Sequence, residues 1–132
     1  MVEIMDPEYH DKVLAITSHI PHLIAYNIVG TANDLANVNK KEVVKYSAGG
    51  FRDFTRIAAS DPIMWRDIFI NNSDAVLEML NYFSSDLDKL KAAIEDNDYE
   101  YLENFFKKTR NVRKNIIEAG QDTQKVDFGR GD

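Results

Sequence analysis

The segment Ser18-His19-Ile20-Pro21-His22 places one hydroxyl and two imidazoles within little more than one helical turn. On a helix, Ser18 and His22 lie four positions apart and His19 and His22 three apart, so the three side chains share one face. Polar groups inside an apolar helix predict a binding site, because burying each of them without a partner costs about 1 to 3 kcal/mol. The alternative is that each histidine is a satisfied core or interface side chain. A metal site is less favoured, because no third ligand stands nearby at a recognisable spacing.

A second candidate is the segment Gly49-Gly50-Phe51-Arg52-Asp53-Phe54-Thr55-Arg56. The two glycines that open the helix, Gly49 and Gly50, let a ligand approach the backbone closely, and the free amides of a first helical turn attract anions. Arg52 and Arg56 lie one turn apart, and a guanidinium binds a carboxylate through two hydrogen bonds. In a chain of net charge -6, this cationic cluster predicts a site for a small anion bearing carboxylates. The alternative, in which Arg52 pairs with an acidic neighbour and Asp53 helps to cap the helix, is weaker for Arg56, whose neighbours favour an inward-facing side chain.

Met64 and Trp65 form a third candidate, directly after a helix start signal at Asp61-Pro62. The only tryptophan of the chain could cover a ligand with its flat apolar face, although such a residue more often belongs to a core or an interface. A basic stretch nearer the C-terminus is instead predicted to be a solvated helix face: Lys107, Lys108, Arg110, Arg113 and Lys114.

Composition excludes several classes of protein. A length of 132 residues suits one domain, and 22 acidic residues against 16 basic ones predict no binding to nucleic acid. The absence of cysteine excludes disulfides, a thiolate zinc site and a cysteine nucleophile. No unbroken apolar stretch approaches the roughly 20 residues of a membrane-spanning helix, and no secretory signal is present, so we expect a cytoplasmic protein with no membrane partner. No glycine-rich turn follows a strand, so we expect no cofactor bound by this chain alone.

The elements that position the candidate residues are all predicted to be helices. Asp6-Pro7 is a start signal for the first helix, which is apolar on nearly every side and is therefore predicted to be central. Pro21 in its interior removes a backbone hydrogen bond and predicts a kink around residues 17 to 21. From residue 31 to 48 the pattern favours one or two short helices in a long connection. A clear helix follows, from after Gly50 to about residue 59.

A long third helix is predicted to begin near Pro62. From Val76 to Ile94 its apolar residues recur in steps of four and three, the spacing of a coiled-coil seam. Asp96-Asn97-Asp98 interrupts this pattern, and a last helix follows with a stop at Gly120. Because the turn between the two helices is short, we expect them to pack antiparallel.

The sequence therefore predicts an all-α fold, a helical bundle with a kinked central helix and a long antiparallel helical hairpin. We expect this domain to span residues 1–120 and to be followed by a polar, disordered tail of residues 121–132. The leucines and phenylalanines of the seam, together with the apolar first helix, offer more apolar surface than one small domain covers internally. We therefore expect a homodimer formed through these helices, and the alternative is a monomer with a well-packed bundle.

Several segments together resemble the C-terminal half of the prephenate dehydrogenases, the NAD(P)-dependent enzymes of tyrosine biosynthesis. The resemblance covers most of residues 5 to 95, and its motifs stand in the order of the family. These motifs are His10-Asp11, Ser18-His19-Ile20-Pro21-His22, Ala48-Gly49-Gly50-Phe51-Arg52-Asp53-Phe54-Thr55-Arg56-Ile57-Ala58 and Asp61-Pro62-Ile63-Met64-Trp65-Arg66-Asp67-Ile68.

The resemblance implies a two-domain enzyme of which this chain is only the second part. In that family an N-terminal Rossmann domain binds NAD or NADP and supplies the catalytic histidine, and a helical C-terminal domain forms the dimer and closes the substrate site. The complete enzyme oxidises prephenate to 4-hydroxyphenylpyruvate with hydride transfer and loss of carbon dioxide. Without the Rossmann domain, the chain alone is expected to be inactive and to hold no catalytic residue. Two alternatives stay open: arogenate as the substrate, or a free-standing helical module that binds a protein partner.

The resemblance also implies roles for individual residues. Arg56 matches the arginine that pairs with a substrate carboxylate, and His22 matches a histidine that helps to hold the substrate. The other matching positions are expected to shape the pocket, to hold Arg56 in place or to form the pocket wall, in part across the dimer: Ser18, Gly50, Asp53, Met64 and Trp65. Neither His19 nor His22 matches the general base of the family.

Overall fold

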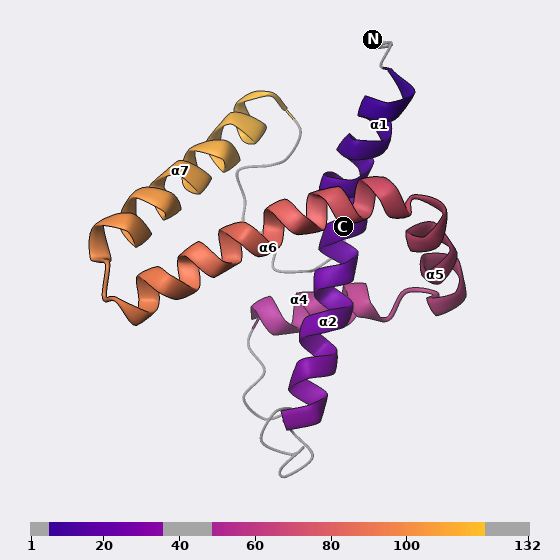
Figure 1. The fold of residues 1–132 in the computed structure, drawn as a ribbon, viewed down its shortest axis with the longest axis horizontal. Helices are drawn as coiled ribbons and strands as arrows, with labels where there is room; N and C mark the ends of the chain where they lie inside the picture. The colour runs from indigo at the N-terminus through magenta and orange to yellow at the C-terminus, as the bar shows by residue number, and fades with distance from the viewer. Residues whose placement is uncertain (1–5, 36–48, 121–132) are drawn as a thin grey trace. The chain divides into compact units, whose positions relative to one another are not determined.

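The computed structural model describes residues 6–35 and 49–120, in which every regular element is a helix (Figure 1). The absence of strands from these residues confirms the all-α prediction. The chain divides within helix α6 into two compact units, one ending at Asn81 and one beginning at Tyr82, and each is described by itself. The elements are α1 (Pro7–Leu14), a π-helical segment η1 (Ala15–His19), α2 (Ile20–Leu35), α4 (Gly49–Ala58), α5 (Pro62–Asn71), α6 (Ser73–Glu95) and α7 (Tyr99–Glu118).

Both start signals of the Asp-Pro type begin helices where the sequence predicts them. The carboxylate of Asp6 accepts a hydrogen bond from the backbone N–H of Tyr9 at 3.3 Å. That of Asp61 accepts one from the N–H of Ile63 at 3.0 Å. In each case the proline at the first helical position has no N–H to satisfy and already holds the helical φ angle.

The first long helix is irregular just before Pro21. Residues Ala15–His19 form a π-helical turn, and the backbone N–H of Ile20 bonds to the carbonyl of Ala15, five positions back. Proline takes one donor out of the α-helical ladder, and a π turn is one of the ways in which a helix absorbs such a defect. The irregularity overlaps the region around residues 17 to 21 in which the sequence predicts a kink.

Helix α4 packs against α2, and the hydroxyl of Tyr26 donates a hydrogen bond of 2.9 Å to the carbonyl of Ser60, just beyond α4. Helix α4, at Gly49–Ala58, confirms the helix predicted from after Gly50 to about residue 59. The sequence predicts that the first long helix ends near residue 31. This prediction is wrong, because residues 31–35 continue α2. Thr31 and Asn33 are weak helix formers, but each costs less than about 0.7 kcal/mol, too little to end a packed helix. The short helices expected further along fall on residues outside the described part of the chain.

The predicted long helix from residue 62 to 95 is wrong in one respect, because it is broken at Asn72. There φ and ψ are -114° and 32°, and α5 ends while α6 begins one residue later in a new direction (Figure 1). The side-chain amide of Asn72 bonds to the backbone carbonyl of Asp11 in α1 at 3.2 Å. Asparagine commonly bonds to backbone groups outside the helical pattern, and this tertiary contact stabilises the break.

In the second unit, the end of α6 and all of α7 form the predicted antiparallel hairpin (Figure 1). Asn97 adopts a left-handed φ of 53°, and the N–H of Asp98 reaches back to the carbonyl of Ala93 at 2.8 Å. The carboxylate of Asp98 then caps α7 by accepting from the N–H of Tyr101 at 3.0 Å. Gly120, with φ of 77°, stands just beyond the end of α7, which confirms the predicted stop. The predicted tail lies outside the described residues.

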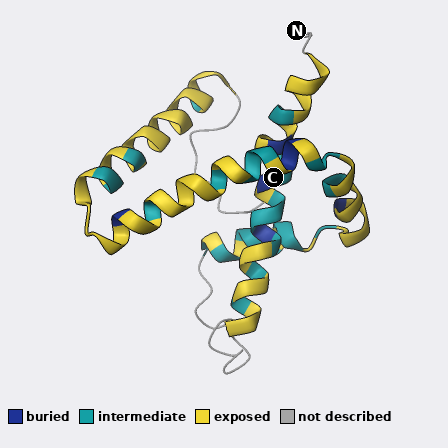
Figure 2. Cartoon of the chain, in the orientation of Figure 1, coloured by how far each residue is buried: buried dark blue, intermediate teal, exposed yellow. Residues whose placement is uncertain are grey.

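Few large side chains are buried within the described residues (Figure 2). The buried apolar residues include four alanines, and only Ile20 combines a large side chain with nearly complete burial, at 1% exposed. The sequence predicts a central first helix covered on several sides, but large apolar side chains of this helix, such as Leu14, Ile16 and Ile28, stay exposed among the described residues. Many large apolar side chains remain exposed along several helices, among them Ile16, Ile28, Ile70, Leu87 and Ile94. Apolar surface of this extent is typical of a domain that associates with another surface.

Among the described residues, one helical stretch, Pro7–Leu35, is long and apolar enough, by length and composition, to cross a membrane. Its most apolar 18-residue window has a mean hydropathy of 1.3. The sequence contains no unbroken apolar run of this length, because Ser18, His19 and His22 interrupt it. These polar residues nevertheless leave the mean hydropathy of the window within the range of a membrane span. A core helix of a folded domain has the same composition, and α2 contacts α4 in this structure.

Candidate functional site

The centre of the candidate site is a stack of two rings from different helices. The imidazole of His22 in α2 lies on the indole of Trp65 in α5, with ring centroids 3.7 Å apart and 17° between the planes. Trp65 is buried, at 8% exposed, and Phe69 from the next turn of α5 lies against it at 5.7 Å. The sequence nominates both His22 and Trp65, and the structure brings them together.

The π-helical turn also orients His22. Its ring nitrogen Nδ1 lies 2.9 Å from the backbone carbonyl of Ser18. A carbonyl oxygen only accepts hydrogen bonds, so Nδ1 carries a proton and Nε2 is the nitrogen whose protonation can change. Ser18 thus contributes through its backbone, from within the π-helical turn just before Pro21.

His19 is held by a residue that the sequence analysis does not nominate. Its Nδ1 lies 3.2 Å from the side-chain nitrogen Nδ2 of Asn72, which also lies 3.2 Å from the carbonyl of Asp11. The ring of His19 meets Trp65 edge-on, with centroids 6.1 Å apart and an angle of 80°. Trp65 therefore contacts both imidazoles of the motif, one through its face and one through an edge contact.

The surroundings of His19 disfavour its charged form. Partial burial lowers the pKa of His19 below its usual value of 6.5, and the neighbouring imidazole of His22 lowers it further. The carboxylate of Asp11 opposes these effects in part. Near neutral pH, His19 is therefore a neutral imidazole.

Arg56 lies at the surface of α4. Its side chain is 55% exposed, and its guanidinium is 3.9 Å from the carboxylate of Asp53 one turn earlier. The expectation that Arg56 faces inward is therefore wrong for this chain by itself, since the Arg56 side chain pairs along the helix surface with the half-buried carboxylate of Asp53 one turn away. Among the described residues, no hydrogen bond or ion pair links Arg56 to His22. Asp53 lies beside Arg56, and its predicted role in shaping the pocket or holding Arg56 in place stays a prediction.

Gly50 and Met64 lie at the first turns of α4 and α5. Gly50 is exposed, and a Cβ atom added to it would meet nothing within 4 Å, so this chain's own packing does not require a glycine there. Met64 is 49% exposed, and its backbone N–H bonds to Asp61 at 3.4 Å. The predicted roles of Gly50 in shaping the pocket or holding Arg56, and of Met64 in the pocket wall, stay predictions.

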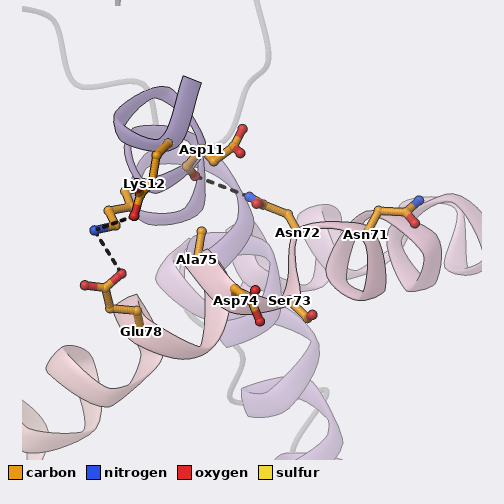
Figure 3. Close-up of a pocket in the computed structure, with 9 residues that line it drawn as sticks. Asp11, Lys12, Asn71, Asn72, Ser73, Asp74, Ala75 and Glu78 are labelled. Carbon is orange, nitrogen blue, oxygen red and sulfur yellow. Dashed lines mark hydrogen bonds and ion pairs between the residues drawn. The ribbon is translucent and has the colours of Figure 1, made fainter. Parts of the chain in front are cut away.

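A hollow of about 450 Å³ lies in the first unit, at the junction of α1 with the start of α6 (Figure 3). Figure 3 shows Lys12 facing Glu78, and its ammonium nitrogen is 3.3 Å from the carboxylate of Glu78 and 3.8 Å from that of Glu8. The remaining acidic lining residues are Asp11 and Asp74, so the hollow is acidic overall. None of the nominated residues lines it, and its charge does not suit an anionic ligand. Within the described residues, no group of three or more His, Asp or Glu side chains is placed to hold a metal ion.

Two further residues contact the rings of the candidate site and are not nominated by the sequence analysis. Phe69 lies against Trp65, and Asn72 bonds to His19. Phe69 lies one turn from Trp65 on the same face of α5, so its contact follows from helical spacing alone. Asn72 stands in the run Asn71-Asn72-Ser73-Asp74, whose residue types favour helix ends. That run was the available signal for the break between α5 and α6.

The fold and the cluster define an all-helical domain in which two imidazoles and an indole meet between adjacent helices. Comparison with known families identifies this domain: the family model of the prephenate dehydrogenase dimerization domain matches residues 6–108. The chain belongs to this family.

Individual relatives agree with the family match. The chain is 44% identical over 112 residues to the cyclohexadienyl dehydrogenase of Zymomonas mobilis, covering 85% of this chain and 38% of that protein. It is 38% identical to the prephenate dehydrogenase of Bacillus subtilis, covering 85% of this chain and 30% of that protein. The structure of Aquifex aeolicus prephenate dehydrogenase with hydroxyphenyl propionate and NAD+ matches with a TM-score of 0.80 at 41% identity, over 88% of this chain and 40% of that one. The chain thus spans less than half the length of these relatives.

Proposed function

We propose that this chain is the substrate-binding and dimerisation domain of a prephenate dehydrogenase, the enzyme that converts prephenate to 4-hydroxyphenylpyruvate with NAD(P)+. The observation that carries the proposal is the stack of His22 on buried Trp65, inside the 6–108 region that matches the family. Two residues nominated from separate motifs meet there. A related structure holds hydroxyphenyl propionate, an aromatic carboxylate, which supports a ligand of this chemical class.

Prephenate carries two carboxylates, so its site needs cationic hydrogen-bond donors. Arg56 supplies an exposed guanidinium whose contact with Asp53 is long, at 3.9 Å, and a bidentate bond to a substrate carboxylate is stronger than such a surface pair. His22 supplies Nε2, which points a proton at an anion when the ring is charged, while Nδ1 stays bonded to Ser18. In the proposal these groups orient the substrate, and orientation lowers the barrier of the reaction.

The proposal places NAD or NADP on the Rossmann domain of the complete enzyme. The described residues contain no strand and so no strand-turn-helix unit of the kind that holds a dinucleotide pyrophosphate. The bound cofactor accepts the hydride, and this chain's residues bind and orient the substrate. By itself, the 132-residue chain is expected to bind substrate without turning it over. A cytoplasmic location accords with this biosynthetic role and stays part of the proposal.

The proposal includes a homodimer formed by the helical domain. Sixteen large apolar side chains are exposed in the described residues, and they occur on η1 and on every α-helix except α4. A partner copy would cover part of this surface and would gain about 25 cal/mol for each Å² of apolar area removed from water. Identical chains most often associate about a twofold axis.

The test uses the complete enzyme, with this chain joined to its nucleotide-binding domain. Arg56→Ala is expected to raise the KM for prephenate at least tenfold, because a charged hydrogen bond contributes about 1.5 to 3 kcal/mol and 1.4 kcal/mol corresponds to a factor of ten. The KM for the nicotinamide cofactor is expected to stay unchanged. Arg66→Ala, which removes an exposed arginine paired with Asp67, is the matched control and should leave both constants as they are.

An unchanged KM for prephenate in the Arg56→Ala enzyme would overturn the proposed role of Arg56. The same assay, run with prephenate and arogenate and with NAD and NADP, identifies the preferred substrate and cofactor by their kcat/KM values. If neither substrate is turned over by the complete wild-type enzyme, the enzymatic proposal fails and a helical binding module remains.

A further inference from the structure

Asn72 bridges two parts of the first unit through a single side-chain amide. Its Nδ2 lies 3.2 Å from the carbonyl oxygen of Asp11 and 3.2 Å from Nδ1 of His19. Since a carbonyl oxygen only accepts, the group facing Asp11 must be the NH₂ and not the amide oxygen. The amide has two hydrogens, and the two contacts use one each.

This arrangement determines the proton positions on His19. With an N–H of Asn72 pointing at it, Nδ1 of His19 must present a lone pair, so the neutral ring carries its proton on Nε2. Adding a proton to Nδ1 would place two N–H groups against each other and would break the bond. The Asn72 contact therefore opposes charge on His19.

His22 has the opposite arrangement. Its Nδ1 donates to the carbonyl of Ser18, and this bond persists when Nε2 gains a proton. The ring also lies flat on the indole face of Trp65 with centroids 3.7 Å apart, a position in which a positive charge is attracted by the aromatic face. His19 meets the same indole edge-on, at 6.1 Å and 80°. The contacts of His22 accommodate charge, whereas those of His19 oppose it.

We propose that Asn72 is a positioning residue that keeps His19 as the neutral Nε2–H imidazole, so that His22 is the member of the pair that takes up a proton when an anion binds. The anion is the substrate carboxylate of the proposed function, on which this part of the inference rests. A neutral His19 beside His22 avoids two adjacent positive rings, whose repulsion would oppose protonation of either.

Within the described part of the chain, groups from several elements face His19. Asp11 in α1 is the acidic neighbour, and its carboxylate is shared with His10 at 4.0 Å. His22 faces it from its own helix, Trp65 faces it from α5, and Asn72 faces it from the α5–α6 junction. Asp11 favours a charge on His19, and the Asn72 bond, burial and His22 oppose it.

The test is ¹⁵N NMR of the imidazoles in the ligand-free 132-residue chain, which contains only three histidines. The wild-type spectrum is expected to show His19 as the Nε2–H tautomer and His22 as the Nδ1–H tautomer. On acidification, His22 should take up its proton before His19. An Nδ1–H tautomer on His19, or protonation of His19 first, would overturn the proposal without any variant.

The decisive variant is Asn72→Asp, which replaces the donor by an acceptor of similar shape. A carboxylate beside Nδ1 is expected to change the tautomer of His19 and to raise the pKa of His19 by about 1 to 3 units. Asn71→Asp adds the same charge at the adjacent, exposed position and is the matched control. Equal increases of the His19 pKa in the two variants would overturn the proposal, because they would show that the added charge, and not the loss of the Asn72 hydrogen bond, raises this pKa. No prephenate is needed, so failure here is distinct from failure of the proposed function.

Discussion

His22 lies flat against Trp65, with 3.7 Å between ring centroids and 17° between ring planes. This stack joins α2 to α5 and sits beside the π-helical turn that precedes Pro21. It places one imidazole flat on an aromatic surface while Nδ1 of the same ring bonds to the carbonyl of Ser18. The geometry of the candidate site thus depends on Trp65, which is also one of the few large buried side chains among the described residues.

Replacing Trp65 by alanine is therefore expected to destabilise the domain. Removing a large buried aromatic side chain costs about 3 to 5 kcal/mol, because the lost apolar contact is accompanied by a cavity. Urea denaturation followed by circular dichroism measures the change in the free energy of unfolding. Met64→Ala, at the preceding exposed position, is the control and should change that free energy by about 0.5 kcal/mol or less. Similar losses in both variants would contradict a core role for Trp65.

The stability of the chain is expected to fall on acidification through His19. Because the pKa of His19 is lowered in the folded state, the unfolded chain binds more protons just below the ordinary value of 6.5. The stabilising contribution is complete above that value and is lost as the pH falls toward the lowered pKa. The free energy of unfolding, measured at about pH 7.5 and about pH 5.5, should decrease more in the wild type than in His19→Gln.

His10→Gln makes the same substitution at an exposed histidine and serves as the control for that measurement, because the His10 side chain lies 4.0 Å from the carboxylate of Asp11 beside it. It should leave the loss of stability that depends on His19 in place. The pH argument fails if His19→Gln loses as much stability between the two values as the wild type does.

Asp61 is expected to stabilise the start of α5, the helix that carries Trp65. Its carboxylate accepts from the backbone N–H groups of Ile63 at 3.0 Å and Met64 at 3.4 Å. Asp61→Ala should cost about 1 kcal/mol in the free energy of unfolding. Asp67→Ala removes only an exposed pair with Arg66 and should cost about 0.5 kcal/mol or less. Thermal denaturation of both variants compares the two costs, and equal melting temperatures would contradict a capping role.

The proposed dimer is tested by the mass of the chain in solution. Sedimentation equilibrium is expected to give about 30 kDa, twice the 15.1 kDa of one chain. Leu87 and Ile94 are 53% and 65% exposed and belong to the apolar seam of α6, so Leu87→Lys combined with Ile94→Lys should weaken association. Ser85→Lys combined with Ala92→Lys adds the same charges at exposed positions that are not part of the seam. A wild-type mass of 15.1 kDa would contradict the dimer.

The fold could be predicted wherever local signals decide it. Asp6 and Asp61 begin helices because the carboxylate of each bonds to amides two or three residues away. The hairpin follows from a short turn at Asn97, which takes a left-handed conformation. The break at Asn72 could not be predicted with the same certainty, because the contact that stabilises it reaches the carbonyl of Asp11 on another helix.

The candidate site was predictable in its members and less so in its contacts. The sequence nominates His22 and Trp65 from residue type and spacing, but their stacking depends on how α5 lies against α2. The inward orientation expected for Arg56 fails because rotation of a helix about its axis is decided by packing, and its guanidinium is exposed beside Asp53. The grouping of His22 with Arg56 in one substrate site stays a prediction.

The position of Trp65 gives this domain a built-in optical reporter. It is the only tryptophan of the chain, and both imidazoles of the motif lie against its ring. Light of a wavelength that the tyrosines do not absorb therefore excites a single indole at the centre of the candidate site. Its emission spectrum follows events at that location without any attached dye.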